Sequence, residues 1–428
     1  MGVATSLATC DQLKMAMLLL IFAALLLAPW QSCSADGGYT YRPLGNVSLP
    51  NPSFVLVLPC GTESPALWVT SFSGNPFSPG EVYTVKSISS YNNFSTVKPV
   101  LVSSDFKWPN IVSVAPKEIG DYLVVPDGFL VPLKSTGGIY LLEADCSGTF
   151  LDTKPIEITA PKSGWFYHKV EWRDINGDGR LDAITARGTK PIFGKSGGEL
   201  LWLEQPPTNP LTAVPWKEHV LTTGPDIGFA TVDFQQGDDQ FELFATEFFA
   251  QRLSVLTIST KNATVTASRD IDTKLGPPFY VSVVDLNMDG TEDLLVTNHV
   301  GGSGGEVFAY EIPKDTLNGD YTKHVIASNF SVTEKGNNQA SPGFAYAFKP
   351  ETSYQGRPYI LVAGDGAQKA YLLTPTDKDF VYNTSVVLSV NGVVGSIGIG
   401  DIIGSDGWAE FFVPDYDENR LYAFTFAP

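Results

Sequence analysis

The sequence has few charged residues, few cysteines and few stretches with helical periodicity. Charged residues make up 17% of the 428 positions and hydrophobic residues 43%, so the chain can bury a large core. Long amphipathic helical runs are missing, whereas glycine (40) and proline (30) are frequent. This combination favours an all-β protein with many turns.

Recognisable catalytic motifs are also missing. The sequence contains no G-x-S-x-G, no H-E-x-x-H and no phosphate-binding glycine loop. The stretch "GGSGGE" at 301–306 is not followed by a helical pattern, so we interpret it as a flexible loop. No carboxylate pair for glycoside hydrolysis stands out among 46 acidic residues. The sequence therefore leaves open whether the protein is an enzyme.

A long apolar run occurs near the N-terminus, at residues 15–28, and no later run is long enough to cross a bilayer. The run follows Lys14 and precedes the small residues Cys33 and Ala35, which suit the −3 and −1 positions of a cleavage site. We therefore expect residues 1–35 to be a secretory signal peptide and residues 36–428 to be the mature protein. A retained signal anchor is the alternative.

The net charge of −18 is unchanged by this cleavage, because it removes one lysine and one aspartate. Such a chain is expected to repel nucleic acid and anionic membranes, so neither is an expected partner. Cleavage also removes Cys10 and Cys33, and the remaining pair, Cys60 and Cys146, predicts one disulfide in a secreted protein. Two separate buried thiols are the alternative. Five sequons fit an extracellular glycoprotein: Asn46, Asn93, Asn262, Asn329 and Asn383.

Two stretches repeat one spacing of oxygen-bearing side chains. "DINGDGRLD" (174–182) and "DLNMDGTED" (285–293) both follow the pattern D-x-N-x-D-G-x-x-D. Ca²⁺ takes six to eight hard oxygen ligands, and such a loop supplies side-chain oxygens and a backbone carbonyl in a tight turn. The predicted ligands are Asp174, Asn176, Asp178, the Arg180 carbonyl and Asp182 in one loop, and Asp285, Asn287, Asp289, the Thr291 carbonyl and Asp293 in the other.

The surroundings of these loops exclude an EF-hand, which needs a glutamate at position 12 and helical flanks. Position 12 is Thr185 in one loop and Val296 in the other, and the flanking segments alternate and are rich in β-branched residues. The loops therefore join strands. A polar turn without metal is the simpler alternative, but two copies in matching contexts favour structural calcium.

Seven units of similar pattern run along the chain. Each has a strand resembling the one after a calcium loop, and the residues that precede these strands are 51 to 66 positions apart: Ala66, Asp121, Asp182, Glu242, Asp293, Tyr359 and Glu410. Each unit predicts a four-stranded antiparallel meander, and repeats of this size indicate a β-propeller. The last unit ends after its third strand, so we expect residues 39–50 to supply the missing outer strand. The prediction is a single seven-bladed propeller over residues 36–428.

Two further loops, 233–242 and 401–410, keep acids at related positions but are one residue longer. Whether they bind a cation or only maintain the turn is left open.

The D-x-[DN]-x-D-G-x-x-D loops and the seven units resemble the FG-GAP or VCBS repeat family, which has integrin-α-like propellers. All seven units share the strand pattern of this family, and two of them carry its strict loop motif. It implies structural calcium on one face of the propeller. The family includes adhesion receptors, lectins and sugar-processing lyases or isomerases. The strands "WKEHV" and "YTKHV" are similar to those of secreted members, some of which resemble aldos-2-ulose dehydratase.

A ligand site is expected at the end of the central channel opposite the calcium loops, where charged and aromatic residues lie at predicted strand ends. The candidates are Trp165, His168, Arg187, Glu247, Tyr280 and His299. Aromatic faces and charged groups there suit a sugar, and His168, Glu247 and His299 are candidates to share a metal. Ordinary polar loops around a channel are the alternative.

Two functions follow as hypotheses. The first is a secreted, calcium-stabilised extracellular binding or matrix protein whose ligand is a carbohydrate or another extracellular protein. The second is a carbohydrate-active lyase or isomerase with its site at the channel end.

Overall fold

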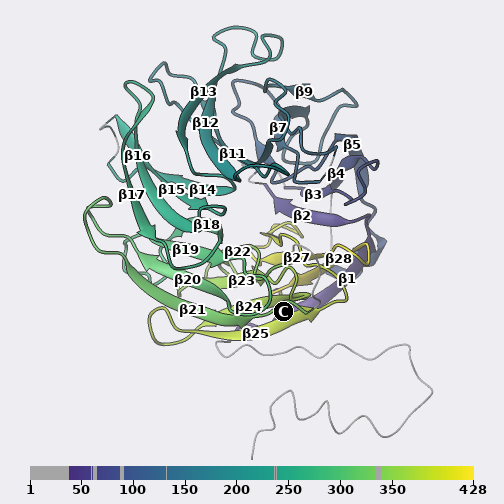
Figure 1. Cartoon of the computed structure of the whole chain (residues 1–428). Helices are drawn as coiled ribbons and strands as arrows, with labels where there is room; N and C mark the ends of the chain where they lie inside the picture. The colour runs from purple at the N-terminus through teal and green to yellow at the C-terminus, as the bar shows by residue number, and fades with distance from the viewer. Residues whose placement is uncertain are drawn as a thin grey trace, which may run out of the picture.

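The computed structural model describes residues 38–58, 60, 65–86, 91–131, 133–235, 237, 239–333 and 339–428. For residues 91–93 it describes the backbone alone. The expected signal peptide, the side chain of Asn93 and Asp238 of the loop 233–242 lie outside these described residues. In the described part, seven four-stranded antiparallel sheets surround a central axis. The prediction of an all-β, seven-bladed propeller is confirmed (Figure 1).

Each blade contributes one strand to each of four concentric layers. The innermost strands are β2 (Pro52–Val57), β6 (Ser113–Val114), β10 (Phe166–Arg173), β14 (Gly228–Val232), β18 (Pro278–Val284), β22 (Ala345–Phe348) and β26 (Gly398–Gly400). The second strands are β3 (Leu67–Ser71), β7 (Tyr122–Pro126), β11 (Asp182–Thr189), β15 (Gln240–Glu247), β19 (Asp293–Asn298), β23 (Tyr359–Ala363) and β27 (Glu410–Asp415).

The third strands are β4 (Gly80–Val85), β8 (Ile139–Glu143), β12 (Gly197–Glu204), β16 (Arg252–Ser259), β20 (Gly305–Glu311), β24 (Lys369–Pro375) and β28 (Arg420–Thr425). The outer strands are β5 (Val100–Phe106), β9 (Ile156–Glu157), β13 (Lys217–Thr223), β17 (Thr264–Asp272), β21 (Thr322–Phe330), β25 (Tyr382–Ser389) and β1 (Arg42–Ser48). A 3-10 helix, η1 (Tyr91–Thr96), precedes β5.

Apolar packing holds each blade to its neighbours. Because successive side chains of a strand point to opposite faces, a blade buried on both sides needs hydrophobic residues at consecutive positions. The second strand β3 (sequence LWVTS) is buried along its whole length, as are β19, β23 and β27. Seven clusters of buried hydrophobic residues lie in the described part between successive blades, one at each blade–blade interface.

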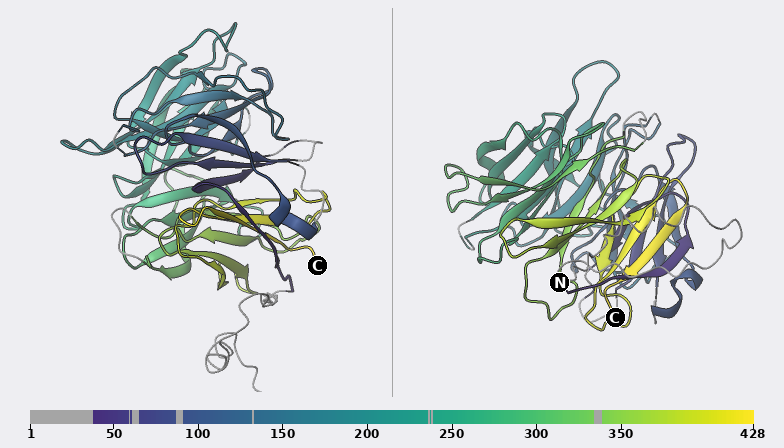
Figure 2. Two further views of the ribbon diagram at one scale, coloured as in Figure 1. Left: turned by 90° about the vertical axis from the view of Figure 1, so that its right-hand side faces the viewer. Right: turned by 90° about the horizontal axis from the view of Figure 1, so that it is seen from below.

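The ring closes through strand β1, as the sequence predicts. β1 pairs antiparallel with β28 and completes blade 7, which otherwise contains only β26, β27 and β28. Figure 2 shows β1 in purple beside the yellow C-terminal strands. Val47 and Leu49 then join the core between blades 7 and 1. β28 is therefore paired on both sides, like the third strand of every other blade, and β1 is the outer strand of blade 7.

The disulfide is confirmed between Cys60 and Cys146, whose Cα atoms are 5.3 Å apart. Cys60 follows β2 in blade 1, and Cys146 follows β8 in blade 2. The bond therefore joins two neighbouring blades on the face that carries the loops between first and second strands.

Candidate functional site

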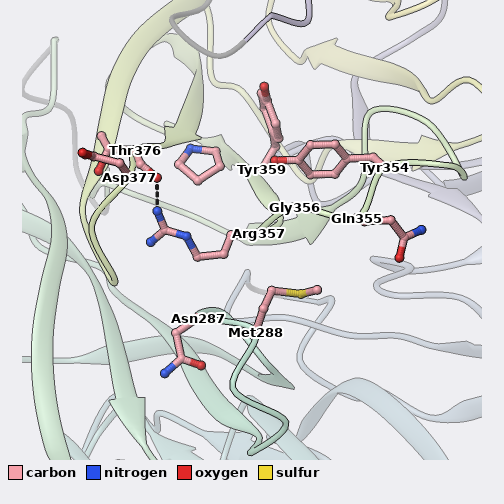
Figure 3. Close-up of a pocket in the computed structure, with 10 residues that line it drawn as sticks. Asn287, Met288, Tyr354, Gln355, Gly356, Arg357, Tyr359, Thr376 and Asp377 are labelled. Carbon is pink, nitrogen blue, oxygen red and sulfur yellow. Dashed lines mark hydrogen bonds between the residues drawn. The ribbon is translucent and has the colours of Figure 1, made fainter.

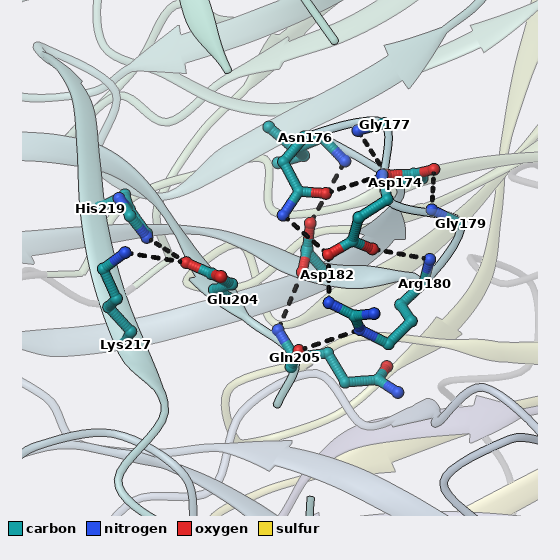
Figure 4. Close-up of polar contacts among 12 residues, drawn as sticks. Asp174, Asn176, Gly177, Gly179, Arg180, Asp182, Glu204, Gln205, Lys217 and His219 are labelled. Atoms are coloured by element: carbon teal, nitrogen blue, oxygen red, sulfur yellow. Dashed lines mark hydrogen bonds and ion pairs between the residues drawn. The ribbon is translucent and has the colours of Figure 1, made fainter. Parts of the chain in front are cut away.

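The loop 174–182 connects β10 to β11 in blade 3 and is organised by its own carboxylates (Figure 4). Asp174 Oδ1 accepts hydrogen bonds from the backbone N–H of Gly177 (2.8 Å) and Asp178 (3.1 Å), and its Oδ2 accepts one from Gly179 (2.9 Å). Asp182 Oδ2 accepts from the N–H of Ile175 at 3.3 Å. The carboxylates at positions 1 and 9 therefore fix the turn from both ends.

The loop 285–293, between β18 and β19 in blade 5, repeats this framework. Asp285 Oδ1 accepts from the N–H of Met288 (2.6 Å) and Asp289 (3.2 Å), and its Oδ2 accepts from Gly290 (2.9 Å). Asp293 Oδ2 accepts from the N–H of Leu286 at 2.9 Å. The two loops therefore share one backbone conformation and one set of acceptors, although they lie two blades apart.

Position 4 of the two loops has a left-handed backbone in both copies. Gly177 has φ = 72° and Met288 has φ = 65°. Glycine adopts this conformation without cost, whereas a methionine there is strained. Because loop 285–293 keeps the conformation despite the methionine, the remaining residues of the motif must determine it.

Burial raises the pKa of the last carboxylate in each loop, to about 6 for Asp182 and about 7 for Asp293, and nearby acids of the same loop add to the rise. Asp178 forms an ion pair with Arg180, whereas no basic side chain is paired with Asp289 among the described contacts. All the candidate ligands are oxygen donors, which is the donor set that Ca²⁺ prefers. By this chemistry the residues of both loops fit calcium.

In the described part of the chain, however, no group of three or more His, Cys, Asp or Glu side chains is placed close enough to hold a metal ion. The carboxylates of both loops are turned toward backbone N–H groups instead.

The longer loop 401–410 in blade 7 uses a carboxylate in the same way. Glu410 Oε2 accepts from the N–H of Ile402 (2.9 Å) and Ile403 (3.0 Å), as Asp182 and Asp293 do from the residue after their position 1. Burial raises the pKa of Glu410 to about 7. The last acid of the motif therefore has a structural task in blades 3, 5 and 7.

The expected ligand residues at the opposite channel end are engaged with other side chains. Arg187 is buried, and its guanidinium binds Glu218 (Nη1–Oε2, 2.7 Å) and Glu199 (Nε–Oε2, 2.8 Å) while it lies over the Trp165 ring. Burial alone would lower the pKa of Arg187, but its hydrogen bonds to Glu218, Tyr167 and Glu199 raise it above the ordinary value. Arg187 and Trp165 therefore come together, as a buried ion-pair cluster.

His168, Glu247 and His299 do not converge. Glu247 is bound by Arg252 Nε and Ser254 Oγ, both at 2.7 Å. His299 pairs with Asp365 (2.9 Å) and stacks on Phe279. The idea that the three share a metal is therefore not supported by their positions.

His168 lies instead among aromatic rings. Its ring centroid is 5.6 Å from that of Phe166, 6.0 Å from Phe129 and 6.2 Å from Phe54. The side chain is 3% exposed, and neither ring nitrogen has a hydrogen-bond partner among the described residues. Burial lowers the pKa of His168 to about 4, so the ring is neutral at physiological pH.

Aromatic side chains from several blades meet across this channel end. Phe54 of blade 1 contacts Phe344 beside blade 6, and Phe344 contacts Phe279 and Tyr280 of blade 5. Trp108 stacks between Phe72 (3.8 Å) and Phe129 (4.9 Å). Burial raises the pKa of Tyr280 to about 12. These rings pack on one another at the channel end, an arrangement that the sequence reasoning did not foresee.

A groove of about 420 Å³ lies on the calcium-loop face instead, beside loop 285–293 (Figure 3). Asn287 and Met288 form one side of it, and residues 354–357 and 375–377 of blade 6 form the other. Arg357 donates to the backbone carbonyls of Thr376 and Lys378, so it holds the blade 6 loops together. Sequence reasoning missed this groove, because its walls come from two blades and carry no motif other than the loop.

Three of the predicted glycosylation sites, Asn262, Asn329 and Asn383, are exposed, and Asn46 on the closing strand is half-buried. Within the described residues, no helix is long and apolar enough to span a membrane.

Comparisons with known proteins identify the architecture alone. No family model and no curated protein matches the sequence. Among solved structures, a chain in an S. cerevisiae complex of dbp5 with nup159, gle1, IP6 and ADP matches with TM-score 0.50 and 9% identity, over 92% of this chain and 96% of that one. The Dos1 propeller matches with TM-score 0.48 and 11% identity, over 90% of this chain and 96% of that one. The WD40 domain of Toxoplasma gondii coronin matches with TM-score 0.47 and 10% identity, over 90% and 86%.

These similarities are too low to assign a family or a function. The chain is a seven-bladed β-propeller, and what it does must be argued from its own residues.

Proposed function

We propose that the protein is a secreted, calcium-stabilised propeller of the FG-GAP or VCBS type that binds an extracellular ligand. The observation that carries this proposal is the identical hydrogen-bond framework of loops 174–182 and 285–293 in two separate blades. Calcium would be held by the side-chain oxygens of positions 1, 3, 5 and 9 and by the carbonyls of Arg180 and Thr291. When bound, it would neutralise the clustered acids of each loop.

Secretion is supported by the disulfide and by the three exposed sequons, since disulfides persist in oxidising compartments. The apolar N-terminal run supports the same route.

For the ligand, the groove beside loop 285–293 is the better candidate, because the aromatic side chains at the other channel end already pack on one another. The groove presents Tyr354 together with the polar side chains of Gln355 and Asp377. An aromatic ring among hydrogen-bonding groups suits a carbohydrate or a polar protein segment. No arrangement among the described residues favours the alternative of a lyase or isomerase.

Thermal unfolding tests the calcium part of this proposal. A ligand that binds only the folded state stabilises it by mass action, by about 2.7 kcal/mol at a hundredfold excess over Kd. Excess chelator should therefore lower the Tm. Asp178→Ala and Asp289→Ala should each reduce the sensitivity to chelator, whereas Asp152→Ala, at an exposed acid outside the loops, should leave it intact. An unchanged melting curve in excess chelator would refute the proposal.

A glycan array tests the ligand part. If the groove binds sugar, Tyr354→Ala and Asp377→Ala should lose the signals that the parent protein gives. Signals that survive both substitutions would locate the ligand elsewhere.

A further inference from the structure

The loops of blades 1 to 3 that face away from the calcium loops differ in charge from the rest of the chain. They are the segments 72–79, 107–112, 127–131, 133–138, 158–165 and 190–196, which we call the blade 1–3 pole. These segments contain five lysines (Lys107, Lys134, Lys162, Lys190 and Lys195) and one acid, Asp127. Lys190 and Lys195 are exposed, whereas Lys134 is buried and Lys162 forms an ion pair with Glu199 (3.4 Å). Asp127 is fully buried and accepts backbone hydrogen bonds from Lys107 (3.0 Å) and Gly138 (2.8 Å).

This local excess of lysine contrasts with 46 acidic and 28 basic residues in the whole chain. The corresponding loops of blades 6 and 7, at 364–368 and 416–419, carry Asp365, Asp417 and Glu418 and no lysine. The basic character therefore belongs to one half of this face. Acids do occur behind the pole at strand positions, among them Glu81, Asp105 and Glu157.

Large apolar side chains project from the same pole. Ile192 is 94% exposed and Phe193 is 93% exposed, at neighbouring positions between Lys190 and Lys195. Phe77 is 84% exposed in the equivalent loop of blade 1, and Leu133 is 70% exposed in that of blade 2. Single exposed apolar residues are common, but several on adjacent loops of one face mark an interaction surface.

The loops of blades 1 and 2 that carry Phe77 and Leu133 are anchored to one another. Lys134 Nζ donates to the carbonyls of Ser73 (2.9 Å) and Ser78 (2.8 Å), so the blade 2 loop is fixed on the blade 1 loop. The N–H of Gly137 donates to the carbonyl of Trp165 at 2.8 Å, which links the blade 2 loop to the start of blade 3. Phe77 and Leu133 therefore lie on connected loops, and Ile192 and Phe193 lie in the turn between the paired strands β11 and β12.

We propose that the blade 1–3 pole docks on an anionic phospholipid surface, with Ile192 and Phe193 inserted among the lipids and Lys190 and Lys195 at the headgroups. Separate protruding tips can enter a bilayer without any rearrangement of the propeller. A polyanionic glycan would satisfy the lysines but would offer no apolar environment to the two tip side chains. The proposal is independent of the calcium and carbohydrate assignments.

The overall charge of −18 does not prevent this docking. Interactions between exposed charges are screened beyond about 8 Å at physiological ionic strength. The membrane therefore senses the charges of the pole that faces it more than those of the far blades. This reverses the expectation, drawn from net charge alone, that the chain avoids anionic membranes.

Vesicle co-sedimentation of the chain expressed from its full sequence tests the proposal. The protein should bind vesicles of equal phosphatidylcholine and phosphatidylserine, and bind pure phosphatidylcholine more weakly. Ile192→Ser with Phe193→Ser should weaken binding about tenfold or more, since both side chains leave an apolar environment. Lys190→Glu with Lys195→Glu should weaken it and reduce its dependence on salt. Val220→Ser, at a half-exposed valine on the outer strand of the same blade, should change nothing.

Three outcomes would overturn the proposal. The first is that the protein binds neither kind of vesicle at low salt, even if it captures a protein partner. Another is equal binding by the parent protein and both double variants. The third is sedimentation without lipid that Ile192→Ser with Phe193→Ser abolishes, which would identify the pole as a contact between copies of the chain.

Discussion

Val47 and Leu421 lie opposite each other in blade 7, where the first strand β1 pairs with the last strand β28. Both side chains are buried in the core that blade 7 shares with blade 1. The two ends of the chain thus stabilise each other, and the closed ring depends on this pair of strands.

Shortening Leu421 should therefore destabilise the whole propeller. Leu421→Ala is expected to lower the free energy of unfolding by about 2 to 5 kcal/mol, through lost burial and the cavity left behind. Denaturant unfolding measures the change. Val386→Ala, at an exposed position on β25, is the matched control and should stay within about 0.5 kcal/mol of the parent protein. If both substitutions changed the free energy of unfolding equally, the pairing of β1 with β28 would contribute no more to stability than an exposed position does.

The disulfide predicts a second stability effect. It closes a loop with a sequence separation of 86 residues. The chain-entropy model gives about 4 to 5 kcal/mol for such a loop, as an upper figure. Reduction, or Cys60→Ser with Cys146→Ser, should lower the Tm. Two alkylatable thiols in the non-reduced protein would contradict the bond.

His168 predicts a dependence of stability on pH. Its pKa of about 4 in the folded protein lies below the ordinary value of about 6.5, so the unfolded chain takes up the proton first as pH falls. The contribution of neutral His168 to the free energy of unfolding is fully present above about pH 6.5. It is lost as the pH falls toward 4, by up to about 3 kcal/mol.

Replacing the imidazole isolates this contribution. Phe54, Phe129 and Phe166 surround the ring, so His168→Phe keeps an aromatic side chain in an aromatic environment. The variant should match the parent protein at pH 7 and be more stable at pH 4. Urea unfolding at pH 7 and pH 4 measures the stability of both proteins. If both lose the same stability between the two pH values, the effect does not come from His168.

The sequence could predict the propeller because its evidence is local and repeated. The alternating strands before and after Asp182 and Asp293 recur in five other units, and a local pattern needs no knowledge of distant contacts. The bond between Cys60 and Cys146 is predicted because they are the two cysteines left after the expected signal cleavage, and the repeats place them in neighbouring blades.

The channel end could not be predicted in this way. Trp108 and His168 each stand at the start of a blade, and nothing in their local sequence shows that Phe72 and Phe54 come from other segments to cover them. Likewise, Arg187 has the sequence position of a ligand-binding residue, yet Glu199 and Glu218 on the next two strands already satisfy it. Contacts with neighbouring strands decide whether such a side chain is free to bind a ligand. These contacts depend on the register in which the strands pair, which the local sequence does not show.

Titration calorimetry measures calcium binding itself. We expect the metal-free protein to bind one Ca²⁺ at each of loops 174–182 and 285–293. Asp178→Ala should abolish one site, Asp289→Ala the other, and the double variant both, while Asp152→Ala keeps both. Absence of calcium binding by the folded parent protein, or undiminished binding by the double variant, would show that these loops are not calcium sites.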